Sequence, residues 1–309
     1  MNNGVLPKVL VIMGTFNGQE FLETQVESIF EQVGVSISLL VRDDGSVDKT
    51  IEILDALAKK FNFEYQVGTN LGFSQNYICL IRSAIQRDWD YLAFADQDDL
   101  WNKEKLTRAL ESLTSGPYEM YSSKRKLFSD QNESRKIFPN GSVFPSFINS
   151  CFENICPGCT IVITKKFAHK VIDYLDVPAT VAIPYDSLLY SLAVDRSELY
   201  FDTSSYIDYR IHLQNTIGIN QNSIFASPNR VETFKQQLTD RVKFFLSPDS
   251  PITTPEHLYQ LRLLFESRFS PSKVAQIFLL PKLRQNPVQN FFFKLYIATF
   301  GSSLNLLEN

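Results

Sequence analysis

The stretch YLAFADQDDLW, residues 91–101, joins a short apolar run to a cluster of aspartates. The run has the length of a buried strand, and Asp96, Asp98 and Asp99 follow it directly. Carboxylates this close together repel one another, and each is destabilised when it leaves water. A chain that places them at the end of a buried strand therefore needs a partner that compensates their charge.

Short apolar runs alternate with amphipathic segments from residue 8 to residue 113. Apolar residues at helical spacing predict a helix after each run, and Asn17 with Glu20 has the pattern of a capping box for the first helix. Strands buried on both faces and joined by helices predict an α/β fold with a mostly parallel sheet covered by helices. The predicted strands are residues 8–13, 37–42, 63–67 and 91–95, and the predicted helices are residues 19–32, 48–61, 74–86 and 103–113.

A polar motif follows each of these strands. The motifs are GTFNG (14–18), RDDGS (42–46), GTNLG (68–72) and DQDD (96–99). In open α/β sheets, ligands bind beyond the carboxyl ends of the strands. We therefore expect the four loops to gather at one edge of the sheet and to form a binding site.

The DQDD aspartates suit a metal ion and a nucleotide. Aspartate oxygens bind hard divalent ions such as Mg²⁺ or Mn²⁺, which also bind phosphates and assist a phosphate leaving group. An ion held there would relieve the repulsion between the carboxylates. The alternative is a solvated loop in which Asp99 caps the next helix, which accounts for one acid and leaves two.

The RDDGS motif places Asp43 and Asp44 before Gly45 and Ser46. A carboxylate at this edge can accept a hydrogen bond from a nucleobase N–H or a ribose hydroxyl. The alternative is an Asx turn that leads into a helix. Because the RDDGS motif is expected to lie beside the DQDD loop, ligand binding is favoured for at least one of the two aspartates.

Composition limits the possible partners. The chain has 309 residues, is 44% hydrophobic and 21% charged, and has a formal net charge of -4. The values are typical of a globular protein, and the acidic balance argues against nucleic acid as a partner. Four cysteines are too few for a disulfide scaffold, which favours a reducing compartment. With no predicted signal peptide or membrane-spanning run, we expect a cytoplasmic protein, soluble or peripherally attached to the membrane.

The second half of the sequence is less regular. Residues 115–150 contain several Gly, Pro and Ser, CTIVIT (159–164) predicts a strand, and residues 182–194 predict a turn and a helix. Beyond residue 225, helical segments alternate with Pro and Ser. We therefore expect an α/β domain at residues 1–224 and a helical C-terminal extension at residues 225–309.

The motifs together resemble the family-2 glycosyltransferases of bacteria. The segments that carry the resemblance are VIMGTFNGQEFLETQVESIFEQ (11–32), VRDDGSVDKT (41–50), NLGFSQNY (70–77), YLAFADQDDLWNKEKL (91–106), PGCTIVIT (157–164), YDSLLYSLA (185–193) and YRIHLQNTIG (209–218). They are most similar to the rhamnosyltransferase-like branch that builds surface polysaccharides. The resemblance covers about residues 7–220 in order, and the combination of motifs makes it specific.

The resemblance implies a GT-A fold for the first domain and transfer of a sugar with inversion of its anomeric centre. It implies a nucleotide-diphosphate sugar as donor, with dTDP-rhamnose first and a UDP-sugar next, and Mg²⁺ or Mn²⁺ as cofactor. The acceptor would be a saccharide of a surface polysaccharide such as O-antigen or capsule. Family members often use lipid-linked acceptors.

The resemblance also assigns a donor site. Phe16 would lie against the base, and Asp44 would bind the edge of a pyrimidine, with Asp43 nearby. Gly14 stands where the family often has Ala, Ser or Thr, so a hydroxyl contact there is missing. The complete set expected around the nucleotide sugar is Thr15, Phe16, Asn17, Asp43, Asp44, Asn70, Asp96 and Arg210.

For the metal, the resemblance implies Asp98 as the main ligand, with Asp96 binding the ribose or the ion. Arg210 would contact the diphosphate, because its forked donors suit phosphate. His212 would be a further ligand, although a lone histidine is more often structural. The residues expected on the acceptor side are Asp99, Trp101, Gly158, Cys159 and Thr160.

Asp186 occupies the position of the catalytic base in the family. Tyr185 replaces the usual His before it and Ser187 replaces the usual Trp after it, which changes the contacts expected for the acceptor. A carboxylate within hydrogen-bond reach can take the proton that the acceptor hydroxyl loses as it attacks. The alternative is that Asp186 caps the helix that follows, and the two roles are compatible.

Two further features have a functional and an ordinary interpretation. CPGC (156–159) has the form of a redox or zinc motif, but no second close pair of Cys or His completes a zinc site. The stretch 279–301 combines basic residues with FFF (291–293) and Tyr296. It would lie on a membrane surface, or it would pack onto the first domain or a second subunit.

Other functional classes are alternatives. A metal-dependent nucleotidyltransferase would share the sheet and the metal, but it typically has a glycine-rich loop with a basic residue after the first strand, which GTFNGQE lacks. A dehydrogenase would need G-x-G-x-x-G there. A non-catalytic sugar-nucleotide-binding subunit has no need of Asp186, so the intact acidic set favours an enzyme.

Overall fold

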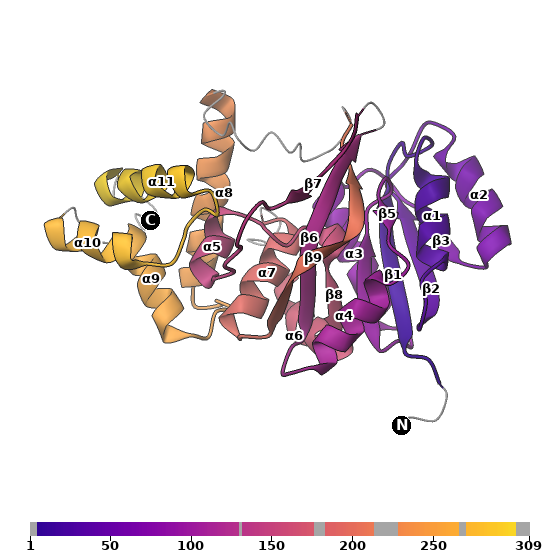
Figure 1. Ribbon diagram of the computed structural model, residues 1–309, viewed down its shortest axis with the longest axis horizontal. Coiled ribbons are helices and arrows are strands. Elements are labelled where there is room, and N and C mark those ends of the chain that lie inside the picture. The colour runs from indigo at the N-terminus through magenta and orange to yellow at the C-terminus, as the bar shows by residue number, and fades with distance from the viewer. Residues whose placement is uncertain (1–4, 130–131, 176–182, 213–227, 266–269, 301–309) are drawn as a thin grey trace. The chain divides into compact units, whose positions relative to one another are not determined.

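The computed structural model describes residues 5–129, 132–175, 183–212, 228–265 and 270–300 (Figure 1). The first of its two compact units contains residues 1–140, 156–175 and 199–218, and the second contains residues 141–155, 176–198 and 219–309. The predicted domain boundary after residue 224 lies outside the described residues, so that division stays a prediction.

Four parallel strands form one half of the sheet in the first unit. β1 (Lys8–Thr15) lies between β2 (Ser36–Asp43) and β4 (Tyr91–Ala95), and β3 (Glu64–Val67) pairs with β2. The side chains of β1 and β4 are almost all buried, as expected for strands covered on both faces. These are the four predicted strands, and their carboxyl ends lie at the same edge.

The sheet continues beyond β4 with mixed strand directions. β8 (Val162–Thr164) is antiparallel to β4, β6 (Met120–Ser129) is antiparallel to β8, and β9 (Leu199–Arg210) is parallel to β6. β5 (Leu100–Trp101) pairs with β9, and β7 (Asn132–Phe138) pairs with β6. The sheet is therefore mixed, and the predicted α/β class is confirmed.

The sequence did not predict β6, β7 or β9. β6 reads MYSSKRKLFS, which lacks the alternation of a strand, although most of its side chains are buried. Arg125 is 8% exposed, and its guanidinium lies 4.9 Å from the centre of the Tyr209 ring in β9. The Tyr209 ring of the neighbouring strand therefore packs against the Arg125 guanidinium. The charge of Arg125 is one reason why this segment resembled a loop in the sequence.

Helices cover the parallel strands. α1 (Leu22–Phe30), α2 (Thr50–Phe61), α3 (Phe73–Ile85) and α4 (Lys105–Thr114) confirm the four predicted helices. α6 (Lys165–Leu175) follows β8 and was not predicted, and the predicted strand 159–164 begins as a short 3-10 helix at Gly158–Thr160.

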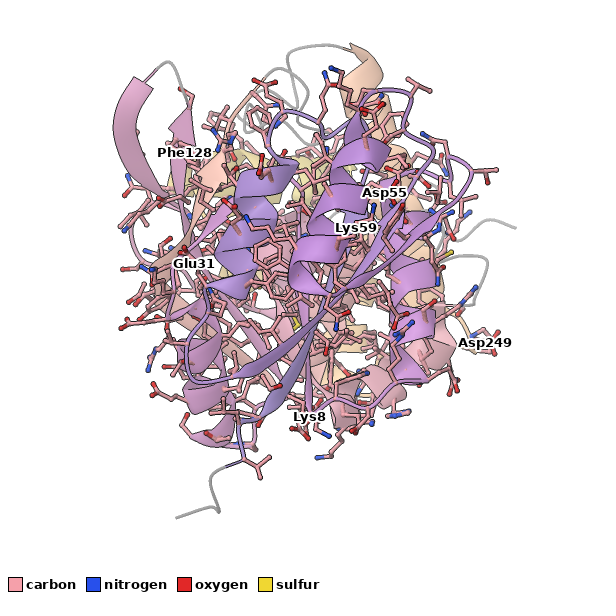
Figure 2. The ribbon with its side chains drawn as sticks, turned by 90° about the vertical axis from the view of Figure 1, so that its right-hand side faces the viewer. Lys8, Glu31, Asp55, Lys59, Phe128 and Asp249 are labelled. Atoms are coloured by element: carbon pink, nitrogen blue, oxygen red, sulfur yellow. The ribbon has the colours of Figure 1, made fainter. Side chains whose placement is uncertain are left out.

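α2 illustrates the pattern that made these helices predictable. Leu54 and Leu57 are buried, whereas Asp55 and Lys59 are exposed and point away from the sheet (Figure 2). Apolar residues at helical spacing therefore define the covered face of the helix.

The predicted capping box at Asn17 is wrong. α1 begins only at Leu22, and its N-cap Phe21 has no side-chain hydrogen bond. Asn17 instead has a φ of 48°, and its Oδ1 accepts a hydrogen bond from Val47 N at 3.0 Å. The side chain that suggested a helix cap holds the RDDGS loop.

The second unit is helical. It contains α5 (Phe147–Phe152), α7 (Tyr185–Asp195), α8 (Pro228–Leu246), α9 (Pro255–Phe265), α10 (Pro271–Leu279) and α11 (Pro287–Phe300). The predicted helical C-terminus is therefore confirmed, and α5 and α7 belong to the same unit. Among the described helices, none combines the length and the hydropathy needed to cross a membrane.

Asp195 joins α7 to the segment around the start of α9. Its carboxylate accepts hydrogen bonds from Thr253 N at 2.9 Å, Thr253 Oγ1 at 3.0 Å and Thr254 N at 3.3 Å, and it lies 2.8 Å from His257 Nδ1. Burial alone would raise the pKa of Asp195. The hydrogen bonds from His257 and the two threonines outweigh burial and lower the pKa to about 2.

We expect Asp195→Ala to lower the free energy of unfolding at pH 7 by about 2 kcal/mol. Because the folded-state pKa lies below the unfolded value, the contribution of Asp195 is complete above about pH 4 and is lost as the pH falls towards 2. Denaturant titrations of both proteins at pH 7 and near pH 3 measure this effect. The difference between them should shrink at the lower pH, and a constant difference would contradict the role of the carboxylate charge.

Candidate active site

Hydrogen bonds join the loops that follow β1, β2 and β4. Phe16 N donates to Gln97 Oε1 at 2.9 Å, and Gln97 Nε2 donates to Phe16 O at 3.0 Å. Asn17 N donates to Ser46 Oγ at 2.8 Å. The GTFNG loop is therefore fixed between the DQDD and RDDGS loops, at the edge of the sheet where the motifs were expected to meet.

Asp43 forms the turn that we gave as the alternative to ligand binding. Its Oδ1 accepts from Gly45 N at 3.0 Å and from Ser46 N at 2.8 Å. Its Oδ2 accepts from Thr15 Oγ1 at 2.9 Å, and both residues are buried. Phe16, by contrast, is 45% exposed, so of these residues its ring offers the surface on which a base could stack.

Asp44 holds the GTNLG loop. Its Oδ1 accepts from Arg42 Nη1 at 2.7 Å and from Leu71 N at 2.9 Å, and its Oδ2 accepts from Gly72 N at 2.8 Å. Asn70 lies in the same loop and is exposed. Contact of Asp44 or Asn70 with a nucleotide stays a prediction, and Asp44 clearly positions the loop that contains Asn70.

The segment after β9 lies against the DQDD loop. His212 Nε2 is 2.7 Å from Asp98 Oδ2. Arg210 Nε donates to Asp98 O at 3.0 Å, and Arg210 N donates to Asp99 Oδ1 at 3.2 Å. The structure thus brings together the residues predicted for the metal and the diphosphate, although more than a hundred residues separate the two motifs.

Arg210 is held by aromatic rings. Its guanidinium carbon lies 4.5 Å from the centre of the Phe21 ring and 4.6 Å from that of Phe128. The Phe21 ring also packs on His212, with a centroid distance of 4.9 Å. These contacts fix a positive charge and an imidazole beside the acidic loop.

The groups around Asp98 fit a divalent ion. A carboxylate and an imidazole already lie together, and this pair suits Mn²⁺, while the carboxylates also suit Mg²⁺. Asp96 Oδ1 accepts a hydrogen bond from Tyr77 OH at 3.1 Å, which orients a second carboxylate of the loop. Asp96, Asp99 and Cys159 also offer ligand atoms that lie within 4.8 Å of one another.

The residues predicted on the acceptor side are all buried. They are Asp99, Trp101, Gly158, Cys159 and Thr160. Burial and the charges of Asp96 and Asp98 raise the pKa of Asp99 well above its usual value. Contact of these residues with a saccharide acceptor stays a prediction, because the structure shows all five packed at and behind the DQDD loop. Asp99 also does not cap α4, whose N-cap is Glu104.

Lys105 packs against one of these residues, and the sequence analysis missed it. Its side chain is fully buried, and its Nζ lies 3.3 Å from the centre of the Trp101 ring. Burial lowers the pKa of Lys105 to about 7, and the nearby acidic groups of Cys159, Asp99 and Asp96 only partly oppose this shift. A lysine at an exposed position of this helix would give the same sequence pattern, so the sequence alone does not show that Lys105 is buried.

Asp186 lies in the second unit, at the start of α7. It is 3% exposed, and its Oδ1 accepts from Ser187 N at 2.7 Å. The alternative that it caps the helix is wrong, because the N-cap is Pro184. Its role as the catalytic base stays a prediction. The four cysteines, all among the described residues, form no disulfide, and the three in the CPGC region and α5 are buried.

Sequence comparison identifies the family. The pattern described as Glycosyl transferase family 2 matches residues 10–165, which include all four loops of the site's edge. The chain belongs to this family. It is 31% identical over 221 residues to the dTDP-rhamnosyl transferase RfbG of Shigella flexneri, which covers 67% of this chain and 74% of the relative. It is 30% identical over 110 residues to the putative teichuronic acid biosynthesis glycosyltransferase TuaG of Bacillus subtilis, covering 34% and 41% of the two chains.

Solved glycosyltransferases share the fold. S. aureus TarS in complex with UDP-GlcNAc has a TM-score of 0.59 at 15% identity, over 97% of this chain and 88% of that chain. The mannosyltransferase PcManGT of Pyrobaculum calidifontis, in complex with GDP-Man and Mn²⁺, has a TM-score of 0.54 at 13% identity, over 97% and 74%. The predicted GT-A fold is confirmed.

Gln97 is a positioning residue that the sequence analysis did not single out. We expect Gln97→Ala to weaken nucleotide binding about 10-fold, because the GTFNG loop loses two hydrogen bonds to the DQDD loop. Gly18→Ala should have a similar effect, since a Cβ there would lie 2.2 Å from Gln97 Oε1 and displace the amide. Calorimetric titration of the two single variants and the double variant tests this. The double variant should be no weaker than Gln97→Ala alone, and fully additive losses would contradict a shared mechanism.

Proposed function

We propose that the protein is a metal-dependent, inverting glycosyltransferase of surface-polysaccharide synthesis. Its donor is a nucleotide-diphosphate sugar and its acceptor a saccharide. Membership of the glycosyltransferase family supports the transfer of a sugar from a nucleotide sugar. The observation that carries the metal-dependent part is the 2.7 Å distance between His212 Nε2 and Asp98 Oδ2, next to Arg210.

In this proposal Asp98, Asp96 and His212 hold Mg²⁺ or Mn²⁺. The bound ion supplies Lewis acidity to the diphosphate leaving group. Arg210 adds a fixed positive charge for the diphosphate, and Phe16 stacks on the base. The hydrogen bonds of Gln97 and Asp44 keep the loops in the arrangement that these contacts need.

We propose dTDP-rhamnose as the first choice of donor and a UDP-sugar as the second. A relative is named as a dTDP-rhamnosyl transferase, and a protein of the same fold was solved with UDP-GlcNAc. Thymine and uracil present the same N3–H donor, so a carboxylate such as Asp44 would accept a hydrogen bond from either base.

We further propose Asp186 as the catalytic base. Its carboxylate takes the proton of the acceptor hydroxyl while the hydroxyl oxygen bonds to the anomeric carbon. The bond from that carbon to the nucleotide diphosphate breaks in the same displacement, so the anomeric centre is inverted. The acceptor in this proposal is a lipid-linked saccharide at the inner face of the cytoplasmic membrane.

Thermal-shift screening of the purified protein tests the donor site first. UDP, dTDP and GDP are compared with and without Mn²⁺ or Mg²⁺, since a ligand that binds only the folded state raises its apparent stability. A metal-dependent shift with dTDP or UDP supports the proposal and directs the transfer assay. No shift with any nucleotide would contradict it, and a shift without transfer to any saccharide acceptor would favour a non-catalytic binding subunit.

A further inference from the structure

Asp186 is a buried carboxylate at the start of α7. It is 3% exposed, and Tyr185 and Ser187 beside it are buried as well. A carboxylate away from water is unstable as an anion unless donors or a cation compensate its charge. Ser187 N supplies one hydrogen bond at 2.7 Å. The base that we propose must be an anion in order to accept a proton, so the group that stabilises its charge has a direct effect on function.

The side of α7 that carries Asp186 faces α5. Asp186 and Tyr190 are four residues apart in the helix and therefore lie on the same side of it. Tyr190 OH donates a hydrogen bond to Asn149 Oδ1 of α5 at 2.9 Å, and both side chains are buried. Long side chains of a helix lean towards its N-terminus, which brings this contact towards the turn that contains Asp186. Asp186 is therefore placed beside the residues of α5 around Asn149.

Arg241 of α8 binds the same part of α5. Its Nη1 donates to Ser150 O at 2.8 Å and to Cys151 O at 2.9 Å. These carbonyls belong to the last turn of the helix, where the helix itself provides no donor. Arg241 is 8% exposed, and its buried Nε has no hydrogen-bond partner among the described residues. A cation with one unused donor is thus held directly after Asn149.

The charges of Arg241 and Asp186 act on each other. Burial lowers the pKa of Arg241, and the nearby Cys151 thiol and Asp186 carboxylate oppose this shift. Their positions against α5 place both charges in one buried region, where little water screens the attraction between them. The guanidinium also compensates the carbonyl oxygens at the end of α5, whose partial negative charge disfavours an anion nearby.

Other titratable groups around α5 are neutral or already paired. The Cys151 thiol is neutral at pH 7, because burial raises its pKa to about 12. Glu153, at the end of α5, has its Oε1 3.9 Å from Arg284 Nη2. His257 of α9 has its Nδ1 2.8 Å from Asp195 Oδ1. None of these groups supplies an uncompensated positive charge to the start of α7.

The remaining charged groups described on α7, α8 and α9 lie nearer the surface or at a distance. Those that are exposed or half-buried are Asp240, Lys243, Glu256 and Arg262. Arg196 follows the opposite end of α7 and donates to a carbonyl of that end. Of the described cations on α5, α7, α8 and α9, Arg241 is therefore the buried one that can compensate Asp186.

We propose that Arg241 is a positioning residue for Asp186. Its guanidinium keeps the Asp186 carboxylate ionised and holds it on the α5 side of α7. The pairing of the two charges depends only on the packing of α5, α7 and α8. Its use rests on the proposed function, in which the ionised carboxylate accepts the proton of the acceptor hydroxyl while Arg241 exchanges no proton.

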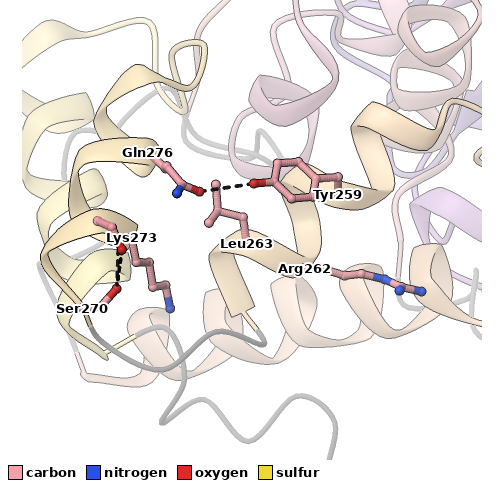
Figure 3. Close-up of a pocket in the computed structure, with 7 residues that line it drawn as sticks. Tyr259, Arg262, Leu263, Ser270, Lys273 and Gln276 are labelled. Carbon is pink, nitrogen blue, oxygen red and sulfur yellow. Dashed lines mark hydrogen bonds between the residues drawn. The ribbon is translucent and has the colours of Figure 1, made fainter.

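The pH dependence of kcat tests this role. Without the cation the neutral acid is favoured and the pKa of Asp186 rises, so Arg241→Gln should move the acidic limb of kcat to higher pH by about 1 unit or more. Arg241→Lys keeps the charge and should leave the limb closer to that of the wild type. Arg262→Gln is the matched control and should not move the limb. It makes the same change at an exposed arginine of α9, in a pocket that Lys273 and Gln276 also line (Figure 3).

A double-mutant cycle tests the pairing without reference to activity. Denaturant midpoints at pH 7 are compared for Arg241→Gln, Asp186→Asn and the double variant. The double variant should lose less stability than the sum of the two single losses, because an uncharged amide no longer needs the cation. If Arg241→Gln alone does not fold, the double variant should still fold for the same reason.

Three results would overturn the proposal and leave Arg241 as a support of α5. They are additive losses of stability, failure of both Arg241→Gln and the double variant to fold, and an acidic limb that does not move in Arg241→Gln. The proposed function fails in a different way. If Asp186→Asn keeps nearly wild-type turnover while the stability losses are non-additive, the pairing is supported and only the assignment of Asp186 as the base is wrong.

Discussion

Substitution of Asp98 by asparagine is expected to lower kcat/KM for sugar transfer by about 10³-fold or more and to abolish metal-dependent binding of the nucleotide. The amide keeps the shape of the carboxylate but removes the charge that a divalent ion requires. It also removes the anionic partner of His212, whose Nε2 lies 2.7 Å from Asp98 Oδ2. Metal affinity and activity should therefore be lost together.

Calorimetric titration of Mn²⁺ in the presence of dTDP or UDP, followed by a transfer assay, measures both effects of Asp98→Asn. Asp173→Asn removes an exposed carboxylate of α6 in the same unit and serves as the matched control. His212→Gln should have an intermediate effect of about 10- to 100-fold, since it removes one neutral ligand. An Asp98→Asn protein that binds Mn²⁺ as tightly as the wild type would contradict the metal site.

The parallel half of the fold is predictable because local patterns decide it. β1 and β4 are mostly apolar runs, and almost all of their side chains are buried, while α2 places Leu54 and Leu57 on one face. Each element could be recognised without knowledge of its neighbours. The strand order is not local in the same way, because β4 follows β3 in the chain but pairs with β1.

The mixed half is different because its strands depend on distant partners. Met120 of β6 pairs with Leu199 of β9, and the polar side chains of β6 are buried only because this pairing exists. The Arg125 guanidinium lies over the rings of Tyr209 and Phe138, both of which come from other strands. The sequence of β6 taken alone resembles a loop, so its local pattern does not predict the strand.

The same distinction applies to the site. The clustering of Asp96 and Asp98 is visible in the sequence, but the approach of His212 to Asp98 is a contact between segments 114 residues apart and followed only from the family resemblance. Asp99 has the same chemistry as its neighbours, yet the structure buries it against Arg210 N. The direction in which each carboxylate of the loop points is a tertiary property, and composition does not encode it.

Replacement of Asp186 by asparagine is expected to lower kcat by about 10²- to 10⁴-fold while donor binding is retained. The base acts only as the acceptor hydroxyl loses its proton, so its removal affects the transition state and leaves the ground-state complex with the donor intact. The amide oxygen can still accept the hydrogen bond that Ser187 N donates at 2.7 Å, which limits damage to α7. This outcome differs from that of Asp98→Asn, where donor binding and turnover fail together.

Transfer kinetics with excess acceptor, combined with the nucleotide titration used for Asp98→Asn, separate these outcomes. Asp249→Asn makes the same chemical change at an exposed position of the second unit and controls for the loss of one charge (Figure 2). If Asp186→Asn weakens metal-dependent nucleotide binding as much as Asp98→Asn does, Asp186 belongs to the donor site and the division of roles is refuted. If turnover persists near the wild-type rate, another group accepts the proton, and the buried position of Asp186, which is 3% exposed, reflects packing of α7.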